Sequence, residues 1–379
     1  MQTWDVAIVG AGMAGASLAW ELTRAGVSVL LLERESQPGT HSTGRSAALF
    51  IETYGTEAIR ALTRASRAFY ETPPAGFADT PILTPRGVAH VATSDEQTEL
   101  AALRAELQPH APDLQALDRE ALLGLLPCLR PEVVAEGLLD PGAADIDVHA
   151  LHQGYLRGLR QQGGTLRCDS EVLGLRREDD RWLLQLPQGA TVAARRVVNA
   201  AGAWADVLAQ RAGAAPVGLV PKRRTAFTFP VPAGMDATHW PAAIGVAEDW
   251  YFKPDAGQLL GSPANADPVQ PHDVVAEELD VAMAIARIEE VSLLTIRRPT
   301  HTWAGLRSFV ADGEFVIGED DALEGFFWLA AQGGYGIQSA AGYALLARNL
   351  LLGEPLDERL RAQGITPAMA TRLAPARFR

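Results

Sequence analysis

The hydrophobic pattern at the start of the chain shows two apolar runs separated by a helical segment. Residues 5–10 (DVAIVG) form an apolar run of strand length, and residues 27–33 (VSVLLLE) form a second run that ends in an acid. Between them, small residues and helix formers lead to Gly26, which is typical of a helix end. This order predicts a βαβ unit with parallel strands and a right-handed crossover.

Later segments repeat the alternation of apolar runs and helical periods. Residues 195–213 predict a buried strand, a glycine turn and a helix, and the C-terminal part predicts strands at 314–318 and 325–330 before a glycine turn and a helix at 337–351. The other predicted elements are helices at 56–70, 95–127, 147–162 and 277–294, a strand pair within 163–186, and antiparallel strands at 224–230, 243–252 and 257–262. The pattern predicts an α/β fold (α+β overall) in which a discontinuous nucleotide-binding domain is interrupted by a second domain.

Composition narrows the possible partners. The chain has 379 residues, of which 47% are hydrophobic and 21% charged, enough for roughly two or three domains. It carries 33 basic and 46 acidic residues, a net charge of −13, and no basic tract. Because nucleic-acid binding depends on Lys and Arg that neutralise phosphates, we expect no nucleic-acid partner. Any anionic ligand must be held by a local basic pocket.

Cysteine content, the N-terminus and one uncharged stretch bear on location. Cys128 and Cys168 are the only cysteines, which excludes a disulfide scaffold and a multi-cysteine metal site, so no metal is predicted. The N-terminus lacks the basic region of a signal peptide, so we expect a cytoplasmic protein. Residues 326–347 contain no charged side chain, but glycines interrupt them, which favours a loop before a buried helix over a transmembrane segment.

The first βαβ unit carries a nucleotide-binding signature. Gly10, Gly12 and Gly15 form G-x-G-x-x-G between strand and helix. The first glycine permits a tight turn, the second lets a pyrophosphate approach the backbone, and the third allows close packing of helix and strand. Glu33 ends the second strand, where an acid accepts hydrogen bonds from ribose hydroxyls and disfavours a 2′-phosphate. The spacing therefore predicts a dinucleotide other than NADP.

The segment after the second strand favours FAD over NAD. Residues 37–50 (QPGTHSTGRSAALF) contain two glycines, several hydroxyl side chains and Arg45. A loop of this kind wraps the far end of FAD in many flavoproteins, whereas NAD enzymes usually continue into a helix. We therefore assign residues 1–80, 141–220 and 300–379 to a Rossmann-like FAD-binding domain, and 81–140 and 221–299 to an antiparallel-sheet substrate domain.

The chain resembles the D-amino-acid oxidase/glycine oxidase superfamily of FAD-dependent amine oxidoreductases from residue 5 to about residue 340. Within it, the chain is most similar to the branch of bacterial D-arginine dehydrogenases. The matching stretches are ERESQPGTHSTGRSAA, ADIDVHALHQGYLRG, VVNAAGAWAD, PKRRTAF, YFKPDAG, LLGSPANADP, EELD, LTIRRPTHTWAGLRSFVADG and GFFWLAAQGGYGIQ. The resemblance implies oxidative deamination of D-amino acids to 2-oxo acids and ammonia, by hydride transfer from Cα to flavin N5.

The resemblance also implies the cofactor residues. Relatives that bind flavin covalently use a cysteine in the C-terminal part, and none follows Cys168, so the FAD is expected to be non-covalent. The implied FAD-binding residues are Gly10, Gly12, Ala14, Gly15, Glu33, Arg34, Ser42, Thr43, Ser46, Ala47, Ala48, Val172, Gly202, Gly305, Gly333, Gly336, Ile337 and Gln338.

For the substrate, the resemblance implies that Arg224 and Arg307 clamp the α-carboxylate. Their planar forks of N–H donors match a carboxylate bidentately. Tyr54 and Tyr251 correspond to tyrosines whose hydroxyls reach the substrate, and Gly334 offers its carbonyl to the amine. No side chain is required as a strong base, because orientation and a preset electrostatic frame supply most of the rate.

Two positions depart from the D-arginine dehydrogenase pattern. Leu49 stands where that branch has a histidine, and Val88 stands opposite a glutamate that holds the guanidinium. Losing that contact would weaken the binding of a cationic substrate by roughly 1.5–3 kcal/mol, which favours neutral or apolar D-amino acids. Glu248, near the Tyr251 lid segment, completes the predicted side-chain pocket, and Glu52 could supply a compensating acid.

Several alternatives stay open. They are an oxygen-using oxidase of glycine, sarcosine or another N-methyl amine, a 2-hydroxy-acid dehydrogenase, and a flavin-binding module without turnover. The electron acceptor, a quinone or another compound, and the oligomeric state are not readable from the residues. Peripheral association with the inner membrane also stays open.

Overall fold

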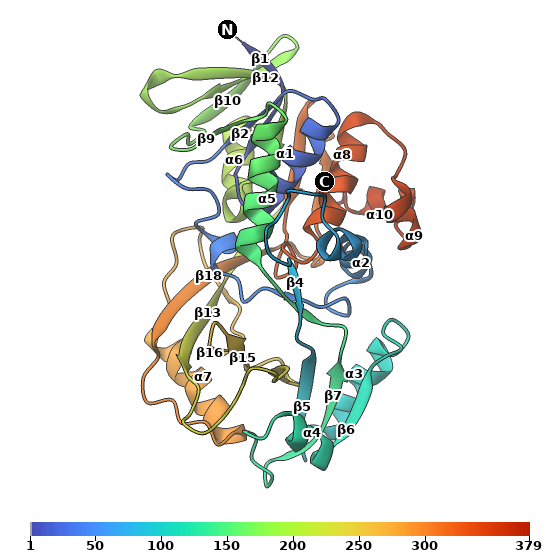
Figure 1. The fold of residues 1–379 in the computed structure, drawn as a ribbon. Helices are drawn as coiled ribbons and strands as arrows, with labels where there is room; N and C mark the ends of the chain where they lie inside the picture. The colour runs from blue at the N-terminus through green and yellow to red at the C-terminus, as the bar shows by residue number, and fades with distance from the viewer. Residues whose placement is uncertain (1) are drawn as a thin grey trace.

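The computed structural model describes residues 2–379 and shows two large β-sheets at opposite ends of an elongated molecule (Figure 1). In the first sheet, β1 (Thr3–Val9) lies between β2 (Val29–Leu32) and β12 (Thr191–Asn199), and all three are parallel. The strands added at the edges are β9 (Thr165–Arg167), β20 (Phe326–Ala330), β19 (Val316–Glu319) and the hairpin β10 (Gly174–Glu178)–β11 (Arg181–Gln185).

Helices cover both faces of this first sheet. One face is covered by α1 (Met13–Arg24), α5 (Val148–Gln161) and α8 (Ala340–Leu352), and the other by α6 (Ala205–Ala212). Alternate residues of β1 enter different cores, because successive side chains of a strand point to opposite faces. Ile8 packs in the core under α1 and α5, whereas its neighbour Ala7 packs in the core under α6.

The second sheet is larger and mostly antiparallel. Its strand order is β18 (His301–Phe309), β13 (Val220–Pro230), β16 (Gln258–Ser262), β15 (Tyr251–Asp255), β14 (Ala242–Gly245), β5 (Val88–Thr93), β7 (Val134–Asp140) and β6 (Gln115–Asp118), with β17 (Asp267–Pro268) also paired to β13. One face packs against α4 (Arg119–Leu125) and α7 (Glu278–Val291), and α3 (Gln97–Leu107) packs beside β5 and β7.

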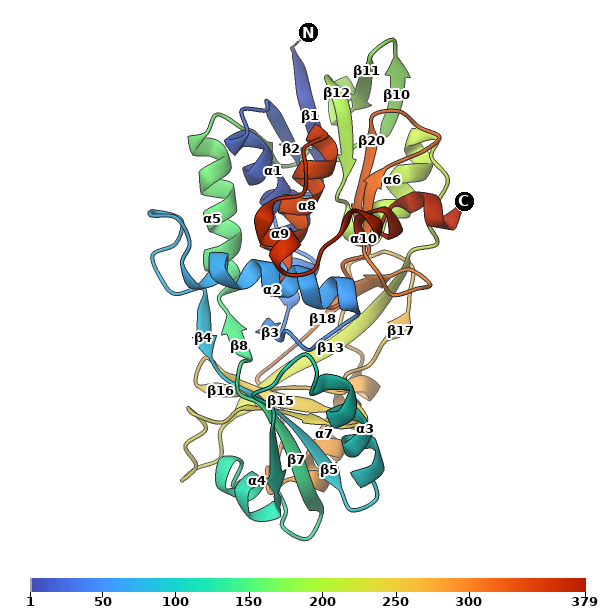
Figure 2. The same cartoon turned by 90° about the vertical axis from the view of Figure 1, so that its right-hand side faces the viewer.

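A small connecting region joins the two sheets. It contains the three-stranded sheet β3 (Leu49–Phe50), β8 (Ala144–Ile146) and β4 (Leu83–Pro85). Helix α2 (Glu57–Glu71) crosses the molecule between the two ends (Figure 2). The last two α-helices are α9 (Glu358–Ala362) and α10 (Pro367–Arg372), and they lie in the half of the molecule that contains the first sheet.

The predicted fold class and the N-terminal βαβ unit are confirmed. The interval 95–127, predicted as helical, instead contains α3, β6 and α4, because β6 is a short polar strand that forms only by pairing with distant β7. The predicted strand 243–252 is two strands, β14 and β15. Strand β18, which the sequence division assigned to the FAD-binding part, pairs with β13 in the second sheet. The domain boundaries stay a prediction.

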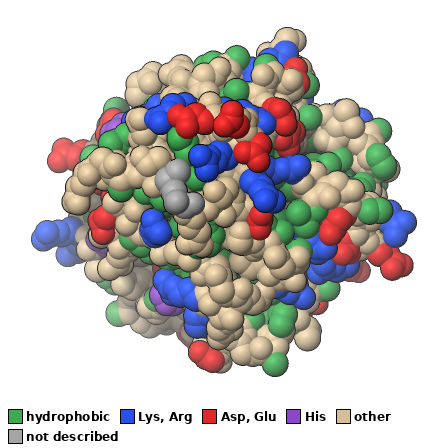
Figure 3. Space-filling view, turned by 90° about the horizontal axis from the view of Figure 1, so that it is seen from above, with side chains coloured by type: hydrophobic (Ala, Val, Ile, Leu, Met, Phe, Trp, Pro, Cys, Tyr) green, Lys and Arg blue, Asp and Glu red, His purple; other side chains and the backbone are tan. Residues whose placement is uncertain are grey.

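The uncharged stretch at residues 326–347 is divided between several elements of the fold. Residues 326–347 form β20, a loop and most of α8. No helix within residues 2–379 has both the length and the apolar character to span a bilayer. On the face nearest the N-terminus, basic and acidic side chains lie beside one another (Figure 3).

Candidate cofactor and substrate site

A continuous cavity of about 230 Å³ is lined by residues of both sheets. From the first sheet it takes the ends of β1 and β2, the start of α1 and the turn after β12. From the second it takes β13, β15 and β18. The loop of residues 39–47 and the glycine turn at 332–337 complete the wall. This is the carboxyl edge of the parallel strands, where open α/β sheets bind their ligands.

The glycines after β1 are required by close backbone contacts. Gly10 has φ +104°, and a Cβ there would lie 2.4 Å from the carbonyl oxygen of Ala200. A Cβ on Gly15 would lie 1.9 Å from the carbonyl oxygen of Gly10. Gly12 is the N-cap of α1 and makes no side-chain cap, so the positive end of the helix faces the cavity.

Polar side chains at this end of the cavity are already oriented by the protein. The Glu33 carboxylate accepts hydrogen bonds from the backbone N–H of Ala11 (2.9 Å) and Glu35 (3.1 Å). The Thr43 hydroxyl accepts one from the Met13 N–H (3.0 Å) at the first turn of α1. Glu33 is buried, yet it lines the cavity at the end of β2.

Two further glycine turns close the cavity. Gly202, after β12, has φ +54° and lines the wall. Gly333 has φ +52°, and a Cβ there would lie 2.6 Å from the Phe309 ring. A Cβ on Gly336 would lie 2.7 Å from the Gln332 side chain. Bare backbone therefore surrounds the cavity on three sides, as a dinucleotide that approaches the chain closely requires.

These features fit FAD. The cavity is lined by fifteen of the predicted cofactor residues, namely Gly10, Gly12, Ala14, Glu33, Arg34, Ser42, Thr43, Ser46, Ala47, Val172, Gly202, Gly305, Gly333, Gly336 and Ile337. Cys128 is buried, Cys168 is half-buried, and neither lines the cavity.

Three predicted cofactor residues do not line the cavity. Gly15 lies behind it, where α1 packs on Gly10. Ala48 is turned away, with φ +51° and its carbonyl accepting the Ile146 N–H. The buried Gln338 amide is used within the protein, because it exchanges hydrogen bonds with the Ile51 backbone and donates to the Thr63 hydroxyl.

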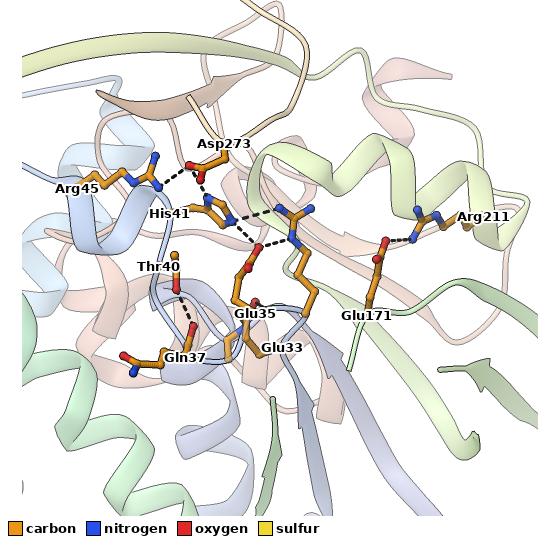
Figure 4. A network of polar contacts seen from close by, with 11 residues as sticks. Glu33, Glu35, Gln37, Thr40, His41, Arg45, Glu171, Arg211 and Asp273 are labelled. Carbon is orange, nitrogen blue, oxygen red and sulfur yellow. Dashed lines mark hydrogen bonds and ion pairs between the residues drawn. The ribbon is translucent and has the colours of Figure 1, made fainter. Parts of the chain in front are cut away.

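A charged group lies around the nucleotide end of the cavity, and of its members the sequence reasoning named only Arg34. Arg34 stacks its guanidinium 3.9 Å above the Trp204 ring, and it pairs with Glu35 at 2.8 Å. Glu35 also contacts His41 (2.9 Å), as Figure 4 shows. Arg211 pairs with Glu171 (2.9 Å) and donates to the Val172 carbonyl (2.6 Å). No local signal identifies these residues, because Trp204 and Arg211 follow β12 and meet the others only in three dimensions.

The strand register brings the two predicted arginines to one face. Arg224 of β13 lies opposite Gly305 of β18, and Lys222 lies opposite Arg307. Arg224 and Arg307 are therefore diagonal neighbours on the same face, and both line the cavity. Gly305 leaves room on that face, since a Cβ there would lie 3.3 Å from the Cβ of Arg45.

Arg223 and Arg224 differ in their partners, because consecutive strand residues point to opposite faces. Arg223 pairs with three carboxylates, those of Asp267, Glu277 and Asp280. Within residues 2–379, neither Arg224 nor Arg307 has a carboxylate partner within the 4.0 Å that defines an ion pair. Burial, together with the positive charge of Arg307, lowers the pKa of Arg224 to about 10.

Tyrosines surround the arginine pair. Tyr251 is buried and lines the cavity, whereas Tyr54 lies beside the Arg307 guanidinium and behind the wall. The Tyr54 ring packs on Tyr335, which the sequence reasoning missed, with ring centroids 4.7 Å apart. Burial and the neighbouring Tyr54 raise the pKa of Tyr335. A Cβ on the predicted Gly334 would lie 3.0 Å from Arg307 Nη1, so bare backbone faces the guanidinium.

The predicted side-chain pocket residues lie beyond this wall. Val88 is fully buried in an apolar cluster with Ile51, Ala143 and Ala242. Leu49, Tyr54 and Ile244 pack against the same cluster. Glu248 is exposed in the turn before β15, has φ +52°, and does not line the cavity.

Comparison with known proteins gives a consistent picture. The family described as FAD dependent oxidoreductase (DAO) matches residues 5–350. Mitochondrial dimethylglycine dehydrogenase of Rattus norvegicus is 28% identical over 211 residues, which are 55% of this chain and 24% of that protein. The chain thus spans about a quarter of that relative's length.

Solved structures of similar fold cover nearly the whole chain. Glycine oxidase from Geobacillus kaustophilus has a TM-score of 0.80, with 22% identity over 97% of this chain and 99% of that one. L-alpha-glycerophosphate oxidase from Mycoplasma pneumoniae with FAD bound has a TM-score of 0.81, with 20% identity over 93% of this chain and 95% of that one. These likenesses establish the fold.

Proposed function

Because the chain belongs to the family of FAD-dependent oxidoreductases and its cofactor is FAD, we propose that it oxidises D-amino acids at the carbon that bears the amine. The observation that carries this proposal is the half-buried pair Arg224 and Arg307, which lines the cavity and has no carboxylate partner among residues 2–379. FAD, when bound, supplies a flavin ring that accepts a hydride from the substrate carbon. Similarity to a dimethylglycine dehydrogenase and a glycine oxidase supports an amino acid as substrate.

The arginine pair is suited to hold an α-carboxylate. Two unpaired cations on one face of a sheet repel each other until an anion lies between them. A carboxylate supplies the missing charge and accepts several N–H bonds, which are strong where water is excluded. In this proposal Arg224 and Arg307 fix the acid end of the substrate, and Tyr251 bounds the same space.

The amine end is handled without a side-chain base. The acids and the histidine that line the cavity, among residues 2–379, are Glu33, His41 and Glu171, and all lie at its nucleotide end. Near the arginine pair the lining offers the Tyr251 hydroxyl, the Ser308 and Gln332 side chains and backbone groups, and none of these is a strong base. The Gly334 carbonyl accepts an N–H from the amine, and binding selects the neutral amine, which has a lone pair to assist oxidation.

The side-chain preference follows from which acids are free. Leu49 and Val88 belong to an apolar cluster, so they offer no charge to a guanidinium. Glu52 pairs with Arg67 (2.6 Å), and Asp145, opposite Leu49 in the sheet, pairs with Arg86 (2.7 Å) and Lys253 (2.8 Å). We therefore expect apolar or neutral D-amino acids to be preferred over D-arginine. The comparisons support the family and do not single out the D-arginine dehydrogenase branch that the sequence analysis favoured.

Steady-state kinetics with a panel of D-amino acids tests this preference. We expect kcat/KM for D-leucine, D-methionine or D-phenylalanine to exceed that for D-arginine by about 10- to 100-fold, the cost of the missing charge-assisted contact. The L-enantiomers serve as the control. A tenfold advantage of D-arginine would contradict the preference, and failure of every D-amino acid to bleach the flavin anaerobically would contradict the function.

A second candidate is an oxidase of glycine, sarcosine or another N-methyl amine that uses oxygen. It is favoured by the similarity to dimethylglycine dehydrogenase and glycine oxidase. Peroxide formation under air with sarcosine, greater than with any D-amino acid, would select it. For the first candidate, the D-amino-acid dehydrogenase, we further propose a cytoplasmic location and an electron acceptor that is a quinone or another compound.

A further inference from the structure

A segment of the substrate part lies across the loop that lines the nucleotide end of the cavity. Asp273, between β17 and α7, accepts a hydrogen bond from Arg45 Nη2 (2.5 Å), and its Oδ1 lies 3.9 Å from His41 Nδ1 (Figure 4). The carbonyl of the next residue, Val274, accepts from Arg45 Nη1 (2.9 Å). We propose that Asp273 and Val274 form a strap that retains FAD by holding this loop closed.

The strap is anchored by an apolar side chain. Val274 is 3% exposed and packs in a cluster with Ala203, Ala304 and Leu306. Ala203 and Leu306 themselves line the cavity. Burial of Val274 therefore places Asp273 directly over the loop, while the Asp273 side chain remains 67% exposed.

From Asp273, contacts continue through the loop to the nucleotide end of the cavity. His41 and Arg45 both line the cavity, whereas Asp273 does not. His41 contacts Glu35 (2.9 Å) and packs on Trp204, with ring centroids 4.8 Å apart. Releasing Asp273 therefore loosens side chains that face the cofactor without removing any of them.

The same loop is also held by β18. The Ser42 hydroxyl donates to the Leu306 carbonyl (2.7 Å), and the Trp303 indole donates to the Arg45 carbonyl (3.1 Å). Arg45 Nη1 also donates to the Ala304 carbonyl (3.2 Å). The strap and β18 thus hold the same loop, and they also pack against each other through Val274, Ala304 and Leu306. In this proposal FAD leaves past this loop, so that opening of the strap precedes release.

The test is the rate of FAD release from the holoenzyme with Asp273→Ala. We expect release to accelerate about three- to tenfold, as for loss of a partly exposed ion-pair network. The matched control is Glu106→Ala. Glu106 is also mostly exposed (60%) and pairs with Arg60 Nη2 at 2.5 Å, which joins α3 of the substrate part to α2. Unlike Arg45, the partner of Asp273, Arg60 does not line the cavity.

Release is followed by the visible flavin absorbance that stays with the protein after rapid gel filtration. Added salt should accelerate release from the wild type and the control, but much less from Asp273→Ala, because the screened contact is already absent. Equal rates for Asp273→Ala and wild type would overturn the proposal, as would equal acceleration by Glu106→Ala. The measurement uses no substrate, so its result is independent of the proposed reaction.

Discussion

The two ends of the cavity differ in whether their polar and charged groups have partners within the protein. At the nucleotide end, polar groups are paired within the protein, as shown by Glu33 accepting two backbone N–H groups and Thr43 accepting one from α1. At the substrate end, Arg224 and Arg307 share one face of the second sheet with no carboxylate beside them among residues 2–379. One end is preformed, and the other is completed by its ligand.

This difference has an energetic consequence. A buried charge without a partner destabilises a fold, whereas a paired one costs little. At Arg224, whose pKa is lowered by burial and by Arg307, the charge therefore costs stability in the free protein, and the α-carboxylate of the proposed substrate would offset that cost on binding. Changes at the two ends should have different signatures, one in catalysis and the other in folding and FAD retention.

The largest effect is expected from Arg307→Met. Losing the ion pair between the Arg307 guanidinium and the substrate carboxylate should cost about 3–4 kcal/mol and lower kcat/KM for a D-amino acid roughly 100- to 1,000-fold. The Tm of the apoprotein should change little, because Arg307 has no carboxylate partner to lose among residues 2–379, and the neighbouring tyrosines raise its pKa. Kinetics and thermal unfolding measure the two effects, and the exposed Arg298→Met is the control. A loss below tenfold would contradict the carboxylate assignment.

At the nucleotide end, Gly15→Ala should act on folding. The new Cβ would lie 1.9 Å from the Gly10 carbonyl oxygen, so α1 must move, at about 1–3 kcal/mol of stability. Purified protein should also retain less FAD. The control is Gly124→Ala in α4, where a Cβ meets nothing within 4 Å and helix propensity improves. Equal Tm and equal FAD content in both variants would show that this packing is not required.

The smallest effect is a pH dependence of anion binding. The pKa of Arg224 is lowered to about 10, so raising the pH through that value neutralises it and weakens carboxylate binding. We expect the Kd of benzoate, which lacks an amine, to rise about tenfold per pH unit above the pKa. Flavin absorbance measures the binding. A Kd for benzoate that stays constant from one unit below that pKa to one unit above it would mean that Arg224 does not hold the carboxylate.

The same pH change that weakens anion binding should stabilise the fold at this group. Because the pKa of Arg224 is lower in the folded than in the unfolded chain, the unfolded chain binds more protons above pH 10, and this group's contribution to stability rises with pH.

The two ends also differ in how far the sequence predicts them. Gly10, Gly15 and Glu33 belong to one βαβ unit, so their spacing alone predicts a dinucleotide site, and Gly10 and Glu33 line the cavity. Arg224 and Arg307 come from strands far apart in the chain. Only the resemblance to a family singled them out, and only the register of β13 and β18 puts them on one face.

The sequence by itself determined the fold class, the first βαβ unit and the choice of dinucleotide, because these depend on local periodicity and on short spacings within neighbouring elements. The tertiary structure decided that β18 joins the second sheet, that the Gln338 amide binds the Ile51 backbone, and that Asp273 reaches Arg45. These contacts depend on hydrogen bonds and charges between distant segments, and such pairings leave no periodic trace in the chain.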